Sequence, residues 1–63
     1  MKVQIIIKTD NAAFEDDPTA EVARILRELA KRIDSHSRFS PGIQLRLRGF
    51  NGNEVGFCTV TEG

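Results

Sequence analysis

One cysteine and one histidine are the residues of this chain best suited to nucleophilic catalysis. A cysteine nucleophile needs a nearby base, which is usually histidine. Cys58 stands in a segment whose pattern predicts a strand, whereas His36 stands in a polar segment that predicts a loop. We therefore do not expect the thiol and the imidazole to be in contact. The chain also has no glycine-rich phosphate-binding loop. The sequence therefore predicts a protein that is not an enzyme and has no cofactor.

Three carboxylates, Asp16, Asp17 and Glu21, stand close enough in sequence to be considered as a cation site. Asp17 stands directly before Pro18, where a carboxylate caps the first turn of a helix and is favoured by the helix dipole. One cysteine and one histidine also fall short of the roughly four ligands of a structural zinc site. We predict no metal site.

Arg46 and Arg48 alternate with leucines, so both project from one face of a predicted strand, about 7 Å apart. That spacing suits either a protein partner or a row of phosphates. A helix predicted over residues 18–34 adds four candidate nucleic-acid-binding residues: Arg24, Arg27, Lys31 and Arg32. The chain has zero net charge and no tryptophan or tyrosine for base stacking, which argues against nucleic acid. Nucleic-acid binding is therefore the alternative, and protein binding the main prediction.

The segments that position these residues follow from hydrophobic periodicity. Residues 2–8 alternate with period two and predict a strand. Helix 18–34 begins at Asp17-Pro18 and carries an apolar stripe formed by Val22, Ile25, Leu26, Leu29 and Ile33. Residues 43–48 and 54–60 predict two further strands, and residues 12–14 a short helical turn that brings Phe14 to the core. The chain is thus predicted to be a single small domain over residues 1–63.

The order of these elements is β–α–β–β, which places the chain in the α+β class. A right-handed crossover through the helix makes the first strand parallel to the second. If the third strand lies between them, every neighbouring pair is antiparallel. We therefore predict a three-stranded sheet in the order 1-3-2, with one helix packed on one face.

The turn between the last two strands decides which side chains face the helix. A two-residue "NG" turn would pair Leu47 with Gly56 and leave Phe57 among the arginines. A three-residue "NGN" loop would pair Leu47 with Phe57 and bury Phe57 together with Val55. Burying each large apolar side chain contributes about 1.5–3 kcal/mol. We therefore predict the three-residue loop.

One helix covers only one side of the sheet, so the other side stays open. With the predicted register, arginines stand there beside apolar side chains, a composition typical of interfaces. The predicted partner-binding residues are Ile6, Arg46, Arg48, Cys58 and Val60. Because 63 residues form a small core and the chain has no disulfide or zinc, a homodimer is also predicted, through the edge of the first strand or the open face.

Three segments in order, "KTDNAAFEDDP", "EVARILRELAKRI" and "NGNEVG", resemble a group of small, mostly uncharacterised proteins encoded by tailed phages and prophages of Gram-negative bacteria. The "RGF" before the turn differs from the "RD" plus aliphatic residue of that group. The resemblance implies a phage-encoded accessory protein that works in the host cytoplasm, with inhibition of a host or defence protein as the leading role. A structural component of the phage particle is a further reading. The N-terminal apolar run is too short for a signal peptide, and the lone cysteine suits a reducing compartment.

Overall fold

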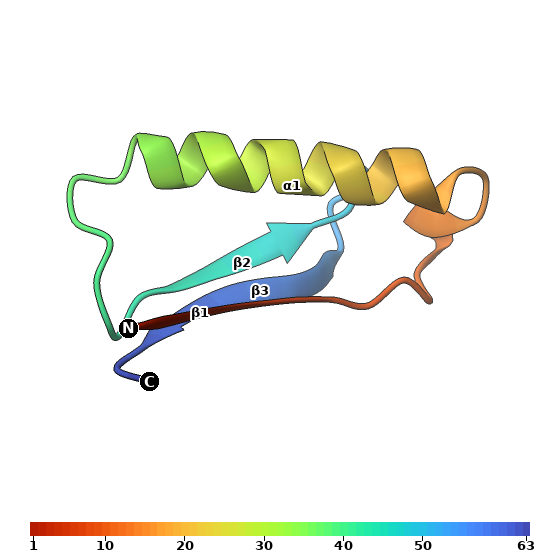
Figure 1. The fold of residues 1–63 in the computed structure, drawn as a ribbon. Helices are drawn as coiled ribbons and strands as arrows, with labels where there is room; N and C mark the ends of the chain where they lie inside the picture. Colours follow the sequence, from red (N-terminus) through yellow and green to blue (C-terminus); the bar gives the residue numbers. More distant parts are fainter.

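The computed structural model describes all 63 residues, as three strands, one long helix and a short 3-10 turn (Figure 1). The elements are β1 (Lys2–Ile7), η1 (Ala12–Phe14), α1 (Pro18–Asp34), β2 (Gln44–Arg48) and β3 (Glu54–Thr61). β3 pairs antiparallel with both β1 and β2, so the strand order is β1-β3-β2. The predicted β–α–β–β arrangement and its 1-3-2 order are confirmed.

The helix α1 begins where the sequence places a cap and a proline. Asp17 Oδ1 accepts a hydrogen bond from the N–H of Ala20 at 3.1 Å, and Pro18 is the first helical residue, where no N–H is needed. At the other end, the Ser35 N–H donates to the carbonyl of Lys31 at 3.1 Å. The helix runs along the length of the sheet (Figure 1). No helix in the structure has the length and apolar character needed to cross a membrane.

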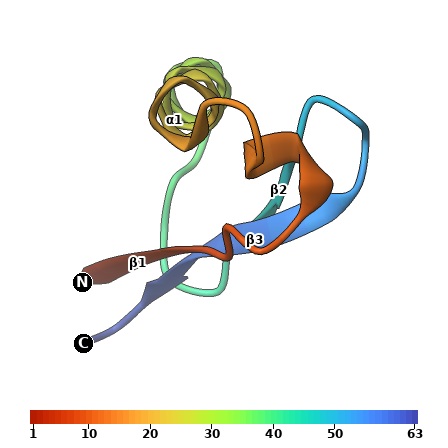
Figure 2. The same cartoon turned by 90° about the vertical axis from the view of Figure 1, so that its right-hand side faces the viewer.

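The core is a thin layer between α1 and the sheet. Ile25 and Leu29 of α1 are each 2% exposed and pack in one cluster with Leu47 of β2. The turn η1 brings Phe14 into the same cluster, as predicted, and lies beside the start of the helix (Figure 2). Leu26, which the sequence assigns to the apolar stripe, is 41% exposed, because it stands about 100° around the helix from Ile25.

The pairing of β2 with β3 contradicts the predicted register. Leu47 lies opposite Gly56, and Arg46 lies opposite Phe57. Phe57 is only partly buried and stands on the side of the sheet away from the helix. The prediction that Phe57 faces Leu47 and packs in the core is therefore wrong.

A bulge in β3 explains how Val55 is still buried. Near the end of β2 the register shifts, and Val55 becomes an extra residue on β3. Val55 and Cys58, which are three positions apart, consequently both face the helix and are 4% and 0% exposed. Gly56 suits this bulge, because a Cβ atom there would lie 1.8 Å from the carbonyl oxygen of Ile6. Regular pairing of β2 with β3, on which the predicted register rests, does not include this extra residue.

The segment between β2 and β3 covers residues 49–53, and the tight loop within it is not the predicted Asn51-Gly52-Asn53. The Gly49 N–H donates to the carbonyl of Asn53 at 2.9 Å and closes the loop. Inside it, the Gly52 N–H donates to the carbonyl of Gly49, also at 2.9 Å. Gly52 has a φ of 87°, which side-chain-bearing residues rarely adopt. The loop closed in this way encloses residues 50–52, one position earlier than the predicted loop, and together with the bulge it gives the observed register.

Candidate functional site

The face of the sheet that α1 leaves uncovered carries three side chains in one row. Ile6 of β1 lies opposite Phe57 of β3, and Phe57 lies opposite Arg46 of β2. Ile6 is 43% exposed, Phe57 is partly exposed, and the Arg46 side chain is 70% exposed. An apolar centre thus stands directly beside a cation. The neighbouring row is polar and consists of Gln4, Thr59 and Gln44.

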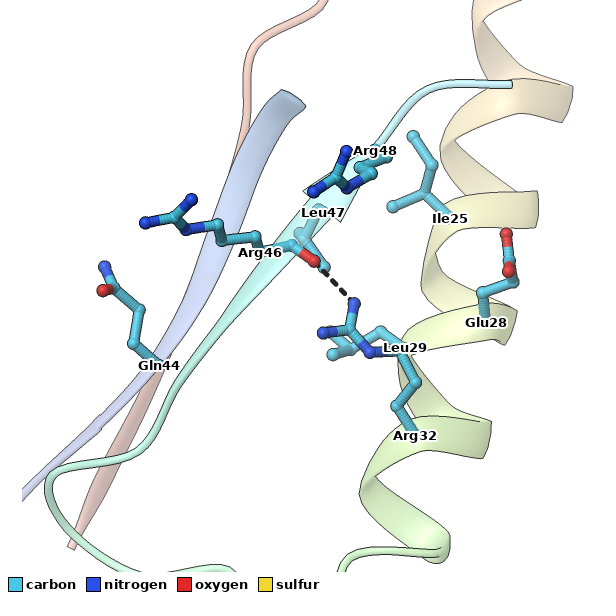
Figure 3. A pocket seen from close by; sticks show the side chains of 8 residues that line it. All are labelled: Ile25, Glu28, Leu29, Arg32, Gln44, Arg46, Leu47 and Arg48. Carbon is cyan, nitrogen blue, oxygen red and sulfur yellow. Dashed lines mark hydrogen bonds between the residues drawn. The ribbon is translucent and has the colours of Figure 1, made fainter. Parts of the chain in front are cut away.

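The guanidinium of Arg46 is held only weakly within the chain. Its Nε lies 3.6 Å from Oε1 of Glu54, and both side chains are more than half exposed. Exposed ion pairs of this kind contribute about 0–1 kcal/mol to stability. Figure 3 shows the side chains of Arg46 and Gln44 extending away from α1. A carboxylate of another molecule can therefore replace Glu54 beside Arg46 at little cost.

The structure brings only part of the predicted partner-binding set together. Ile6 and Arg46 share the outer row, whereas Arg48 follows the irregular pairing and its Nη1 lies 3.5 Å from the carbonyl of Gly52. Cys58 and Val60 are 0% and 2% exposed and lie on the helix-facing side. Their predicted place on the open face is wrong, because the register differs by one residue from the predicted one. Phe57 takes the central position that the prediction gave to Cys58.

The single thiol and the single imidazole stand in different parts of the fold. Burial raises the pKa of Cys58 above its usual value, although the charge of Arg32 acts in the opposite direction. His36 Nδ1 lies 3.0 Å from the carbonyl oxygen of Arg38, in the loop that follows α1. No group of three or more histidine, cysteine, aspartate or glutamate side chains is placed to hold a metal ion.

Two of the four cations of α1 that were predicted to bind nucleic acid make hydrogen bonds to the backbone of β2. Arg32 Nη1 donates to the carbonyl of Arg46 at 2.5 Å, and Arg24 Nη2 donates to the carbonyl of Arg48 at 3.2 Å. These carbonyls point away from β3, so the two arginines cover the free edge of β2. The remaining two predicted cations, Arg27 and Lys31, are exposed.

A cleft of about 460 Å³ lies between α1 and β2, above the edge that the arginines cover. Its floor is apolar and is formed by Ile25, Leu29 and Leu47. Arg32 reaches across it to β2, as the dashed hydrogen bond in Figure 3 shows. The cleft is therefore spanned by the protein's own side chain, and the open face of the sheet is the less obstructed binding surface.

Glu21 is a residue whose role the sequence reasoning missed. It is 7% exposed and accepts hydrogen bonds from Arg24 Nε at 2.9 Å, from Arg24 Nη2 at 2.8 Å and from the Phe50 N–H at 2.8 Å. The hydrogen bonds from Arg24, reinforced by the Phe50 N–H, hold the pKa of Glu21 below its usual value of 4.5. A signal was present in the sequence: Glu21 stands four residues before Ile25 and therefore on the buried side of the helix.

Comparison of the chain with protein family models, with curated proteins and with solved structures finds no match. What the structure itself defines is a small α+β domain with one covered and one open sheet face.

Proposed function

We propose that this protein is a non-enzymatic accessory protein, encoded by a phage or prophage, that binds another protein through the open face of its sheet. The observation that carries the proposal is the exposed row formed by Ile6, Phe57 and Arg46. An apolar centre beside an arginine is a frequent composition of protein interfaces. The resemblance described above supports the phage origin and the host cytoplasm as the place of action.

The chemistry of this row supports one kind of partner. Ile6 and Phe57 favour an apolar side chain seated over β1 and β3, and Arg46 favours a carboxylate beside it. The flanking glutamines offer amide groups for hydrogen bonds at the rim. We propose that the partner is a host or defence protein with an apolar patch bordered by acidic residues, and that occupation of this patch inhibits it.

Nucleic-acid binding remains the second proposal, because Arg46 on the sheet and Arg27 and Lys31 on α1 are exposed cations. Two observations count against it. Arg24 and Arg32 are engaged with the edge of β2, and the open face offers one aromatic ring, Phe57, for stacking. Protein binding is therefore the proposal that the geometry supports better.

The test is capture of partners from host lysate by the tagged protein, with and without nuclease treatment. Wild-type protein should retain a defined host protein after nuclease treatment, and Arg46→Glu should lose it while Arg27→Glu retains it. Both variants change an exposed arginine on a folded surface, so their difference reports on the sheet face. Loss of all captured material after nuclease treatment would instead support nucleic-acid binding.

A further inference from the structure

We propose that the free edge of β1 pairs with β1 of a second copy of this chain, in an antiparallel arrangement about a two-fold axis. This inference concerns self-association and does not depend on the identity of any host partner. It selects one of the two dimer surfaces that the sequence left open, and it specifies a register.

The backbone of β1 has unpaired groups along its outer edge. The Lys8 N–H donates to the carbonyl of Val55 at 2.8 Å, so even-numbered residues of β1 bond to β3. The N–H and C=O groups of Val3, Ile5 and Ile7 consequently point outward, because they alternate along an antiparallel strand. Such an edge is a template for another strand.

The two edges of the sheet differ in the hydrogen bonds that they receive from the rest of the chain. At β2, two outward carbonyls accept hydrogen bonds from Arg24 and Arg32 of α1. At β1, no hydrogen bond from outside the sheet reaches the outward groups of Val3, Ile5 or Ile7. Only the β1 edge is therefore free to accept a strand.

The side chains around the β1 edge are apolar and exposed. Val3 and Ile5 lie on the helix-facing side and are 43% and 44% exposed. Leu26, 41% exposed, is on the flank of α1 opposite the arginines that reach β2, and therefore on the side of β1. A two-fold axis perpendicular to the sheet places both helices on one side, so these three residues of each copy would line the space between them.

Charge selects a register in which Ile6 faces the partner's Ile6. In this register Ile5 faces the partner's Ile7, and the chain that continues past the end of β1 at Ile7 would bring Asp10 of the partner toward Lys2. The register centred on Ile5 instead sets Lys2 against the partner's Lys8, twice in each dimer. Like charges directly opposite each other in a sheet are destabilising, and opposite charges are stabilising. The β1 edge of one copy is therefore complementary in charge to the β1 edge of a second copy.

The register centred on Ile6 also places the outward N–H and C=O groups of one β1 opposite the outward groups of the other. Ile6 would face its copy in a pair without hydrogen bonds, and the outward groups of Ile5 would bond to those of the partner's Ile7. On the open face, the row of Arg46, Phe57 and Ile6 would continue into the same three side chains of the partner. The dimer is thus one six-stranded sheet.

Cross-linking through an introduced cysteine tests the register. Residues facing each other without hydrogen bonds have Cα atoms about 4.5 Å apart, within disulfide range. Ile6→Cys should form a disulfide-linked dimer on mild oxidation. The matched control Gln4→Cys should not, because Gln4 faces the partner's Lys8. Wild-type protein should not cross-link either, because Cys58 is buried. Cross-linking of Gln4→Cys but not of Ile6→Cys would overturn the register.

Sedimentation of the pure protein tests the association itself. Wild type should reach twice the monomer mass at high micromolar concentration, and Ile6→Lys should be a folded monomer by circular dichroism, because this side chain is exposed in the single copy. Lys2→Glu should weaken the dimer about tenfold, and adding Asp10→Lys should restore it. A monomeric wild type, a dimeric Ile6→Lys, or a dimer strengthened by Lys2→Glu would each overturn the proposal.

Discussion

The carboxylate of Glu21 accepts a hydrogen bond from the backbone N–H of Phe50 across 2.8 Å, which joins α1 to the loop between β2 and β3. Arg24 holds the same carboxylate with two further hydrogen bonds and also reaches the carbonyl of Arg48. The loop has a second anchor, since Asn51 Nδ2 donates to Asn11 Oδ1 at 2.9 Å. The loop that sets the register of β3 is thus fixed to two other segments.

Glu21→Gln should lower the thermal midpoint by several degrees, because it removes the charge that Arg24 and the Phe50 N–H bind. The matched control is Glu28→Gln. Glu28 also pairs with Arg24, but its side chain is 61% exposed, so its loss should change stability little. Thermal denaturation followed by circular dichroism measures both. Equal effects of the two substitutions would contradict the role assigned to Glu21.

The stabilisation by Glu21 should depend on pH in a defined direction. Its pKa is lowered in the folded state, so the stabilisation is fully present above its usual value of 4.5 and is lost as the pH falls through the lower folded value. The difference in free energy of unfolding between wild type and Glu21→Gln should therefore shrink in acid. Urea titrations at neutral and acidic pH measure it. A difference that stays constant would refute the assignment.

Gly56→Ala should destabilise the fold by about 2–4 kcal/mol, because its Cβ would lie 1.8 Å from the backbone carbonyl oxygen of Ile6. Gly52→Ala is the comparison, since a Cβ there meets nothing within 4 Å and only the φ of 87° is strained. That strain should cost about 1–2 kcal/mol. Chemical denaturation of both variants measures the difference. A Gly56→Ala variant as stable as wild type would mean that the bulge is not at this position.

Cys58 should be unreactive toward thiol reagents in the folded protein. It is 0% exposed, and its raised pKa reduces the thiolate that such reagents attack. Labelling in increasing urea should follow the unfolded fraction. Rapid labelling in native buffer would place the thiol on the surface, as the sequence-based register had it.

The fold was predictable because each element has its own local signal. The Asp17-Pro18 start and the buried pair Ile25 and Leu29 define α1, and the alternation in β2 defines a strand with one buried face. The strand order follows from the handedness of the crossover and from antiparallel pairing. The signals for the helix and for each strand lie within short stretches of sequence, and the structure confirms them.

The register of β3 was not predictable in the same way. Alternation assigns Val55 and Phe57 to one face, and only a bulge separates them. The bulge depends on the contact of Gly56 with the backbone of Ile6, which is 50 positions away in sequence. The same error affects the predicted site. Ile6 and Arg46 lie on the open face, as predicted, whereas Cys58 and Val60 lie on the helix-facing side and Phe57 lies on the open face instead.

The measurement that tests the proposed function most directly is the affinity of a captured partner for three proteins: wild type, Arg46→Glu and Arg27→Glu. Arg46 belongs to the open-face row, whereas Arg27 is an exposed arginine of α1, so the two changes carry the same charge reversal on opposite sides of the molecule. Open-face binding predicts a loss of affinity of about tenfold or more for Arg46→Glu and wild-type affinity for Arg27→Glu. Equal affinity of Arg46→Glu and wild type would contradict binding through this face.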